Sequence, residues 1–453
     1  MSKNNNQNIT IIGAGIGGCY LAILLAKKGF TIDIYERSIE KEIISSYTEA
    51  RSYNLTFYDF GIKALKEADV WNDIEPTLVK LIGSVTQISD NPERFVKDKP
   101  YHAVQRDTLL KTLITKAKTY PTVTFHFGVP LVAINRQEKT IVIQDSQTKK
   151  YTAVPFEVLF GADGVNSQVR ASLQLGQQTH HIQEYANWEY KQIHITKDMG
   201  IKMQLKNDLM YAWTRKESII LAHPNKDESF SALLIVPKGL NIGFNALTTE
   251  QAIKQYFSDN FKPFLPTIDS VVKDLLNNPR SYFVTIYTQP WYYKGLIAVL
   301  GDAAHGFNPF YGQGISAAFA DCQIIVDLID KYGPEWNTIF PLYQEARKKH
   351  TDALATLSKD SIRQYRRHKK ADYASVYNKL DMILYNIFPT LFVPPPYVKI
   401  ASNPQYTYDY LEKHKQQRNR AKWVGVPIVV RLVTGIIAIQ EKLGNSFSKQ
   451  KTS

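Results

Sequence analysis

The sequence predicts an α/β fold in which a domain built on a parallel sheet is interrupted by a second, mainly antiparallel sheet. Two observations predict this arrangement. Short apolar runs that end in glycine-rich turns and lead into helices occur at 9–18 and again at 296–314, and such strand–turn–helix units build parallel sheets. Between them, from about 180 to 285, strand-like segments follow one another with little helix, which is typical of an antiparallel sheet.

The N-terminal unit has the pattern of a Rossmann-type dinucleotide-binding site. Its apolar run at 9–12 enters the motif Gly13-x-Gly15-x-x-Gly18 and then a helix. In such a motif one glycine makes the tight turn, one lets the backbone approach a pyrophosphate, and one lets helix and strand pack closely. The helix N-terminus offers free N–H groups and a positive dipole end to the phosphates.

An acidic residue in the expected place strengthens this interpretation, because a glycine motif alone is weak evidence. The first helix is expected to end at Gly29, and a second strand follows over 31–35. That strand ends at Glu36, about 20 residues beyond the motif, where an acid can accept hydrogen bonds from a ribose. We assign Glu36 and its neighbour Arg37 to the dinucleotide site.

The remaining elements follow from apolar periodicity. Helices are expected over 62–71, 106–118 and 314–330, and residues 73–103 are mixed and turn-rich. Strands are expected over 123–127, 131–135, 140–144, 156–160, 191–195, 201–205, 218–222, 231–236 and 296–300. From 341 onward the pattern is helical, with a proline break at 394–396.

These patterns predict a discontinuous domain organisation. The nucleotide-binding domain occupies 1–180 and returns at 286–345, while 181–285 forms an inserted sheet domain to which 73–103 also contributes. Residues 346–453 form a helical C-terminal region.

Composition indicates an ordinary folded protein. The chain has 453 residues, of which 44% are hydrophobic and 21% charged, so disorder is not expected. Its two cysteines do not suggest a disulfide framework, and its polar first residues do not resemble a signal peptide; both favour the cytoplasm. The histidines do not cluster at metal-ligand spacing, so no metal site is expected.

The net charge of +13 leaves two classes of partner open. A basic chain can bind nucleic acid, or it can bind anionic cofactors and an anionic membrane surface. The basic runs lie outside any nucleic-acid recognition motif, so we expect no nucleic-acid partner.

Three further motifs join the N-terminal one. Arg106 opens a helix, GADG stands at 161–164, and GDAAH at 301–305 is followed by Pro309 and by GQG at 312–314. Together, over roughly 8–345, these motifs resemble the single-component FAD-dependent aromatic hydroxylases, which share the para-hydroxybenzoate hydroxylase fold. The resemblance implies a discontinuous Rossmann-type FAD-binding domain, with the inserted sheet as substrate domain.

The resemblance also implies a set of cofactor-site residues. The glycine motif would hold the ADP half of FAD, with Glu36 at the adenosine ribose. Asp302 would bind the ribityl chain, and the turn at 309–314 would place N–H groups beside the isoalloxazine. His305 is left open between a flavin contact and a structural hydrogen bond. The implied set is Gly13, Gly15, Gly18, Glu36, Arg37, Arg51, Arg106, Asp163, Gly164, Asp302, Pro309, Gly312, Gln313 and Gly314.

Within that family the chain is most similar to the kynurenine 3-monooxygenase group, through RSYNL at 51–55, PFYGQG at 309–314 and DC at 321–322. This similarity implies that Tyr101 and Tyr406 contact substrate. Two positions depart from the group: the stretch 79–88 lacks its carboxylate-binding arginine, although Lys80 could carry the charge, and Ser361 stands where the group has asparagine. The resemblance therefore predicts an aromatic substrate without fixing it as L-kynurenine.

The implied activity is that of an FAD-dependent monooxygenase, which takes electrons from NAD(P)H and uses O₂ to hydroxylate an aromatic ring. A second GxGxxG motif is missing, so a dedicated NAD(P)H domain is not expected. Two alternatives remain open: a flavin-dependent halogenase or reductase on the same fold, and a non-catalytic flavoprotein-fold binding module.

The C-terminal stretch 423–443 is strongly apolar but contains Pro427 and Arg431. A spanning helix needs about 20 apolar residues, so we expect a helix that lies in the membrane interface, flanked by basic residues. The alternative is a helix packed on the protein or in a dimer interface.

Overall fold

The computed structural model describes residues 7–45, 54–88, 91–175, 178–215, 217–240, 243–366 and 404–423, together with short pieces at 382–383, 385–386, 393–394 and 400. The chain divides into two units. The first comprises Met1–His368 with Ser402–Gln405, and the second comprises Lys369–Ala401 with Tyr406–Ser453.

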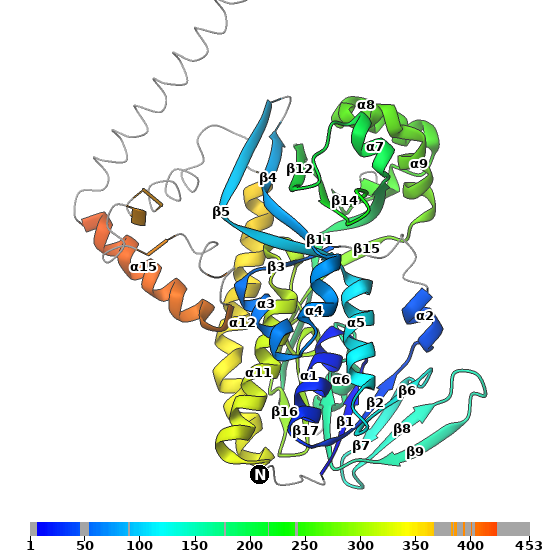
Figure 1. Cartoon of the computed structure of the whole chain (residues 1–453), viewed down its shortest axis with the longest axis vertical. Coiled ribbons are helices and arrows are strands. Elements are labelled where there is room, and N and C mark those ends of the chain that lie inside the picture. Colours follow the sequence, from blue (N-terminus) through cyan, green and yellow to red (C-terminus); the bar gives the residue numbers. More distant parts are fainter. Residues whose placement is uncertain are drawn as a thin grey trace, which may run out of the picture. The chain divides into compact units, whose positions relative to one another are not determined.

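A six-stranded sheet forms the base of the first unit and confirms the predicted α/β class (Figure 1). Its strands pair in parallel except for the β16–β17 edge. Strands from distant parts of the sequence, β10 and β17, continue the sheet on one side of β1. In spatial order the strands are β16 (Tyr292–Tyr293), β17 (Ile297–Val299), β10 (Val158–Gly161), β1 (Asn8–Ile12), β2 (Thr31–Glu36) and β6 (Val123–Phe127).

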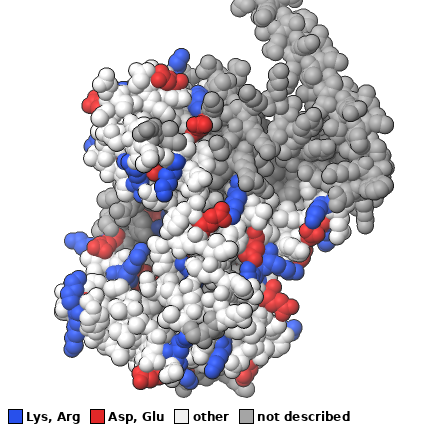
Figure 2. All heavy atoms as spheres, turned by 180° about the vertical axis from the view of Figure 1, so that it is seen from behind, with Lys and Arg blue, Asp and Glu red and all other residues white. Residues whose placement is uncertain are grey.

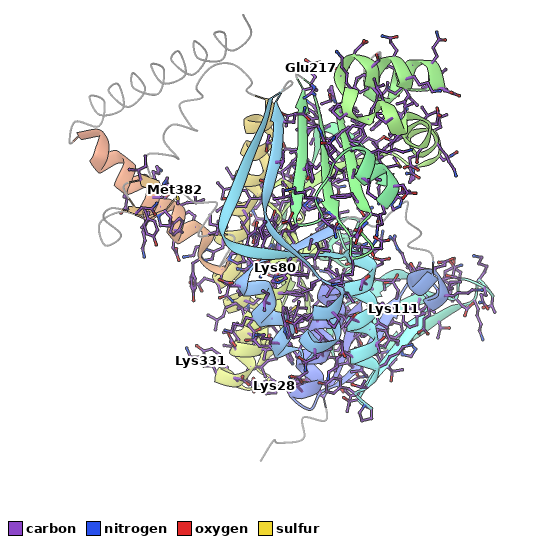
Figure 3. The ribbon with its side chains drawn as sticks, turned by 45° about the horizontal axis from the view of Figure 1, so that its top comes forward. Lys28, Lys80, Lys111, Glu217, Lys331 and Met382 are labelled. Carbon is purple, nitrogen blue, oxygen red and sulfur yellow. The ribbon has the colours of Figure 1, made fainter. Side chains whose placement is uncertain are left out.

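Helix α1 (Ile16–Lys27) lies at the centre of this half, in contact with α5 (Arg106–Lys118) and α11 (Gly314–Tyr332). Every residue of α1 from Gly18 to Ala26 is buried, which explains why the helix has no polar face. Figure 3 shows Lys28, just after α1, and Lys331 of α11 at the same end of this unit, where Lys28 pairs with Asp330 at 2.5 Å.

An eight-stranded sheet forms the other half of the first unit. Its pairs are antiparallel except for β12 with β4, which is parallel. In spatial order the strands are β15 (Ser281–Gln289), β11 (His180–Ile195), β14 (Phe230–Pro237), β13 (Ser218–Pro224), β12 (Leu209–Arg215), β4 (Val79–Ile88), β5 (Asn91–Gln105) and β3 (Asn54–Phe57). Residues 54–105 thus supply three strands, and the domain boundaries drawn from the sequence stay a prediction.

Three expectations for this half are wrong. The strand expected over 201–205 overlaps helix α7 (Lys197–Lys202), because the Thr196 hydroxyl caps the N–H of Met199 and starts a helix there. The stretch 73–103 is not turn-rich, since it contains most of the long β4–β5 hairpin. Helix is not scarce either: α8 (Glu250–Asn260) and α9 (Ile268–Asn277) follow β14 and bury their apolar faces with the sheet.

Smaller elements complete the first unit. Strands β7 (Leu131–Asn135), β8 (Thr140–Gln144) and β9 (Tyr151–Pro155) form a separate antiparallel sheet. The other elements are the helices α2 (Glu40–Ser45), α3 (Asp59–Glu67), α4 (Trp71–Ile74), α6 (Gln168–Leu173), α10 (Asp302–His305) and α12 (Trp336–Arg366), and the short 3₁₀ helices η1 (Glu75–Thr77), η2 (Gly243–Asn245), η3 (Lys262–Thr267) and η4 (Pro309–Tyr311).

The described surface carries both signs of charge. Figure 2 shows lysine and arginine interspersed with aspartate and glutamate on one face of the molecule. The net charge of +13 is therefore not gathered into a single basic patch on the described part of that face.

The second unit contains α15 (Thr407–Trp423), which follows η5 (Pro404–Tyr406). The Tyr410 hydroxyl donates a hydrogen bond to the carbonyl of Pro394 within this unit. Of the predicted interfacial helix at 423–443, all but Trp423 lies outside the described residues. Among the helices that the structure describes, none combines the length and hydropathy that crossing a membrane requires.

Candidate functional site

The three motif glycines between β1 and α1 differ in what surrounds them. Gly13 has a φ of +104°, and a Cβ there would lie 2.5 Å from the carbonyl oxygen of Ala162. A Cβ on Gly18 would lie 2.1 Å from the carbonyl oxygen of Gly13. By contrast, a Cβ on Gly15 would meet only that Ala162 oxygen, at 3.9 Å, among the described atoms. Gly15 therefore faces open space that a ligand can approach.

Glu36 stands beside this loop. The Ala14 N–H donates to its Oε2 at 2.9 Å, and the Ser38 N–H donates to its Oε1 at 2.9 Å. The carboxylate is thus fixed in orientation while each oxygen keeps a lone pair for a further donor. Arg37, the next residue, is exposed.

Asp163 and Gly164 lie where the segment after β10 meets the glycine loop. The Asp163 carboxylate accepts hydrogen bonds from the Ser167 hydroxyl at 2.5 Å and from the N–H groups of Gln168 and Val169 at 2.7 and 3.2 Å. Burial raises the pKa of Asp163, although these hydrogen bonds act in the opposite direction. Its carboxylate caps α6, so only its remaining lone pairs are left for a cofactor.

Asp302 lies at the carboxyl end of β17, the edge where ligands bind such sheets. It follows Gly301, whose φ is +57°. The side chain is exposed to solvent, yet burial raises its pKa, against the nearby positive charges of His305 and Arg106. Arg106, at the start of α5, is close enough to influence both Asp302 and Tyr190.

A buried charge network supports the segment that carries Asp302. The Asp321 carboxylate accepts from the Gly301 N–H at 2.9 Å and from Arg347 Nε at 2.8 Å, and its Oδ2 lies 2.5 Å from His305 Nε2. Burial by itself would raise the pKa of Asp321, but His305 and Arg347 together lower it. This network favours the structural hydrogen bond over the flavin contact for His305.

The turn after η4 lies next to strand β3. Gly312 has a φ of +67°, and a Cβ there would lie 3.1 Å from the Thr56 hydroxyl oxygen. A Cβ on Gly314 would meet no described atom within 4 Å. Gln313 is fully buried, and its Oε1 has no hydrogen-bond partner in the described part of the chain. Pro309 is exposed at the start of the turn.

Tyr101 lies on the β4–β5 hairpin. It is 2% exposed, stacks on Tyr58 with 5.2 Å between ring centroids, and places its hydroxyl 3.4 Å from the Gly83 carbonyl oxygen. Leu81 opposes Tyr101 across the hairpin, whereas Lys80 opposes His102 and so lies on the other face. Burial and the charge of Lys80 both lower the pKa of His102.

Two predicted site residues are not placed at this site. Arg51 lies outside the described residues. Tyr406 belongs to the second unit, where it is 59% exposed.

Comparison with known proteins agrees with this geometry. Residues 6–353 match the family model described as FAD binding domain. The chain belongs to this family. A relative named kynurenine 3-monooxygenase from Flavobacterium psychrophilum is 30% identical over 78% of this chain and 79% of its own. Another of that name, from Salinispora tropica, is 28% identical over 96% of both chains.

Solved structures share this chain's fold at low sequence identity. A tetrameric 2-methyl-3-hydroxypyridine-5-carboxylic acid oxygenase is 17% identical, with a TM-score of 0.67 over 81% of this chain and 94% of its own. The Klebsiella pneumoniae HpxO R204Q variant complexed with FAD is 18% identical, with a TM-score of 0.64 over 91% of this chain and 99% of its own. The chain is thus an FAD-dependent monooxygenase of the aromatic hydroxylase type.

The residues present fit FAD. Open space at Gly15 and at Gly314 leaves both backbone turns accessible, and the fixed Glu36 carboxylate and the shielded Asp302 carboxylate lie at the carboxyl ends of two parallel strands. Which of these residues contact the cofactor stays a prediction.

Sequence reasoning missed Arg347 and the role of Asp321. One signal was present, since Asp321 is a single acid among buried apolar residues of α11. Such an acid needs a buried cationic partner, but nothing local identified Arg347 as that partner.

Proposed function

We propose that this flavoprotein hydroxylates a small aromatic substrate that carries a carboxylate, with NAD(P)H as electron donor and O₂ as oxidant. Bound FAD supplies the redox and oxygen-transfer chemistry. The observation that carries the proposal is the close approach of Gly312, in the turn before α11, to the eight-stranded sheet: a Cβ on Gly312 would lie 3.1 Å from the Thr56 hydroxyl oxygen. This close approach supports a substrate held on that sheet beside the cofactor.

The chain's own residues would bind the cofactor, orient the substrate and shield the reacting centre from water. The N-terminus of α11, a helix of 19 residues, favours negative charge on the cofactor. An apolar cluster of Trp188, Ile219, Ile235 and Phe283 packs against Phe310 of the 309–314 turn. Such a wall excludes water from the reacting centre.

The test is NADH and NADPH oxidation by the FAD-loaded protein against a panel of aromatic acids and aromatic amino acids. We expect at least one acid to stimulate oxidation and to yield a product heavier by one oxygen atom. Peroxide release, measured alongside, separates hydroxylation from uncoupled oxidation. Oxidation that no aromatic compound stimulates, or halide incorporation in place of oxygen, would contradict the proposal.

We also propose a peripheral membrane contact through 423–443. Support comes from sequence: an apolar stretch interrupted by Pro427 and Arg431, with basic residues on both sides. Each basic residue can gain about 1 kcal/mol near an anionic leaflet. In a flotation assay with anionic liposomes at low salt, the full chain should float and a chain truncated before Lys413 should not. Loss of folding on truncation, without membrane binding by the full chain, would assign the helix to the protein core.

A further inference from the structure

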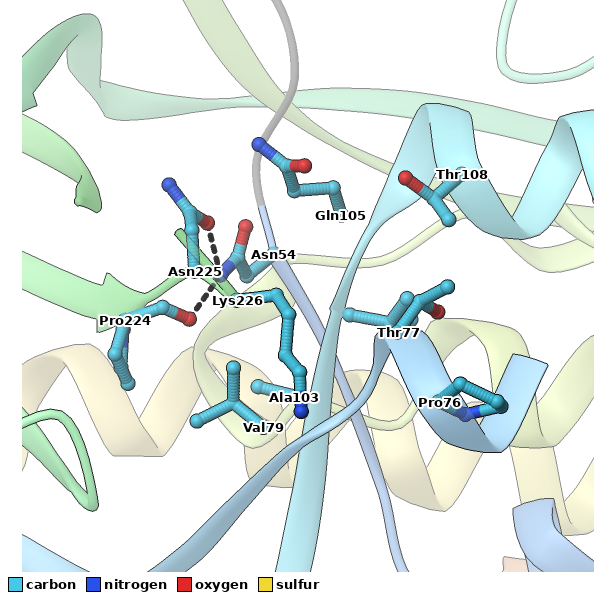
Figure 4. A pocket seen from close by; sticks show the side chains of 11 residues that line it. Asn54, Pro76, Thr77, Val79, Ala103, Gln105, Thr108, Pro224, Asn225 and Lys226 are labelled. Carbon is cyan, nitrogen blue, oxygen red and sulfur yellow. Dashed lines mark hydrogen bonds between the residues drawn. The ribbon is translucent and has the colours of Figure 1, made fainter. Parts of the chain in front are cut away.

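A pocket lined by polar and apolar residues lies where strands β3, β4 and β5 meet. It has a volume of about 260 Å³ and is bounded by strand β3, by the β4–β5 hairpin and by the turn between β13 and β14 (Figure 4). None of the cofactor-site residues, nor Tyr101, lines this pocket.

The strand register places this pocket on the same sheet face as Tyr101. Ala103 opposes both Thr56 and Val79, and Asn54 opposes Gln105. Residues directly opposite each other, or two apart along a strand, share a face. The pocket-lining residues Asn54, Val79, Ala103 and Gln105 therefore share a face with Thr56, which meets Gly312. Since two residues span about 7 Å along a strand, the pocket adjoins the predicted flavin position.

Lys226 gives this pocket its charge. It is the one charged residue among the pocket-lining residues, and it forms no ion pair within the described part of the chain. Figure 4 shows its side chain extended from the β13–β14 turn toward Val79 and Ala103. An ammonium group without an acidic partner, at the mouth of a pocket without a carboxylate, favours an anionic ligand.

Asn54 supplies the second polar feature. Its Nδ2 donates to the Pro224 carbonyl and to Asn225 Oδ1, both at 2.8 Å, which fixes the amide orientation (Figure 4). Its Oδ1 is buried and has no hydrogen-bond partner among the described residues, and the side chain is 9% exposed. A buried acceptor without a partner costs stability, so a ligand that donates to it gains affinity.

We propose that this pocket holds the polar end of the aromatic substrate, with Lys226 paired to its carboxylate and Asn54 Oδ1 accepting from an adjacent amino group. The proposal rests on the proposed function. It assigns substrate specificity to the β13–β14 turn, because Lys80 on β4 lies on the other face of the hairpin from Tyr101. The ligand class is a compound that presents a carboxylate and an N–H donor side by side, such as an aromatic amino acid.

The test is equilibrium binding to the FAD-loaded full chain. The probes are anthranilate and L-kynurenine, each compared with its primary amide, in which an uncharged carboxamide replaces the carboxylate. We expect the wild type to bind at least one acid more tightly than its amide, and Lys226→Met to weaken that acid about ten-fold, as a charged hydrogen bond would, with little effect on the amide. Lys226→Arg should keep most of the preference for the acid.

The matched control is Lys202→Met, because Lys202 is also exposed but does not line the pocket; it should bind both compounds like the wild type. The proposal is overturned if neither acid binds better than its amide, or if Lys226→Met weakens acid and amide equally. Hydroxylation assays separate the two proposals. Acid binding that depends on Lys226 without any hydroxylation would contradict only the proposed function, and hydroxylation unaffected by Lys226→Met would contradict only the pocket.

Discussion

The two ends of the candidate cofactor site are built in different ways. The glycine-loop end comes mainly from one continuous stretch, β1 to Glu36, which meets a single distant segment at Ala162. The flavin-turn end is assembled from strand β3, the start of α5, the Gly301–Gly314 segment, and Asp321 with Arg347. A local unit tolerates changes elsewhere in the chain, whereas an assembled one depends on distant contacts that hold it in register.

The largest effect should come from a single substitution at the local end. Gly15→Val should abolish FAD binding, because the side chain would occupy the open space that a pyrophosphate needs. Flavin absorbance of the purified variant measures this, and circular dichroism should show a fold like that of the wild type. A yellow Gly15→Val protein would show that the loop is not the phosphate site.

At the assembled end, Asp321→Asn should destabilise the protein by about 3–5 kcal/mol, since it leaves Arg347 and His305 buried without their carboxylate. Urea unfolding at pH 7 measures the loss. The pKa of Asp321 is lowered in the folded state, so its contribution is present above the unfolded-state pKa and is lost as pH falls through the folded-state pKa. The difference from the wild type should therefore shrink in strongly acidic solution.

Asp302→Ala should act on the cofactor and not on the fold, which sets it apart from Asp321. Its pKa is raised by burial, so the ionised carboxylate costs stability at neutral pH and its removal should leave the free energy of unfolding unchanged or slightly higher. FAD affinity should fall, by about ten-fold if one charged hydrogen bond is lost. Normal flavin content and turnover would show that Asp302 merely begins α10.

The smallest effect should be that of Tyr101→Phe. The Tyr101 hydroxyl is 3.4 Å from the Gly83 carbonyl oxygen, a weak contact, while its ring packs in the Val79–Leu81 cluster. Folding and flavin content should stay normal, and KM or coupling should change by a few-fold if the hydroxyl meets substrate. Kinetics identical to the wild type would restrict Tyr101 to a packing role.

For elements that a local apolar pattern defines, the bounds in the structure match those predicted from the sequence. The bounds of α5, β6, β7 and β8 are those expected from periodicity alone. The strand predicted over 201–205 was wrong, because an apolar run does not distinguish a strand from the end of a capped helix. The β4–β5 hairpin was missed because its long strands are stabilised by pairing with β3 and β12, which adjoin it only after folding.

The sequence by itself determined the nucleotide-binding unit, because Gly18 and Glu36 act on neighbours within one βαβ unit, although Gly13 also lies against Ala162 after β10. Tertiary structure decided which charged residues meet at the flavin-turn end of the candidate cofactor site. It joined Asp321 to Arg347 and brought Lys226 to the pocket beside Asn54, while the pleat of β4 turned Lys80 away from Tyr101. The physical reason is that a strand's pairing and register select the face that each side chain occupies, and partners distant in sequence set that register.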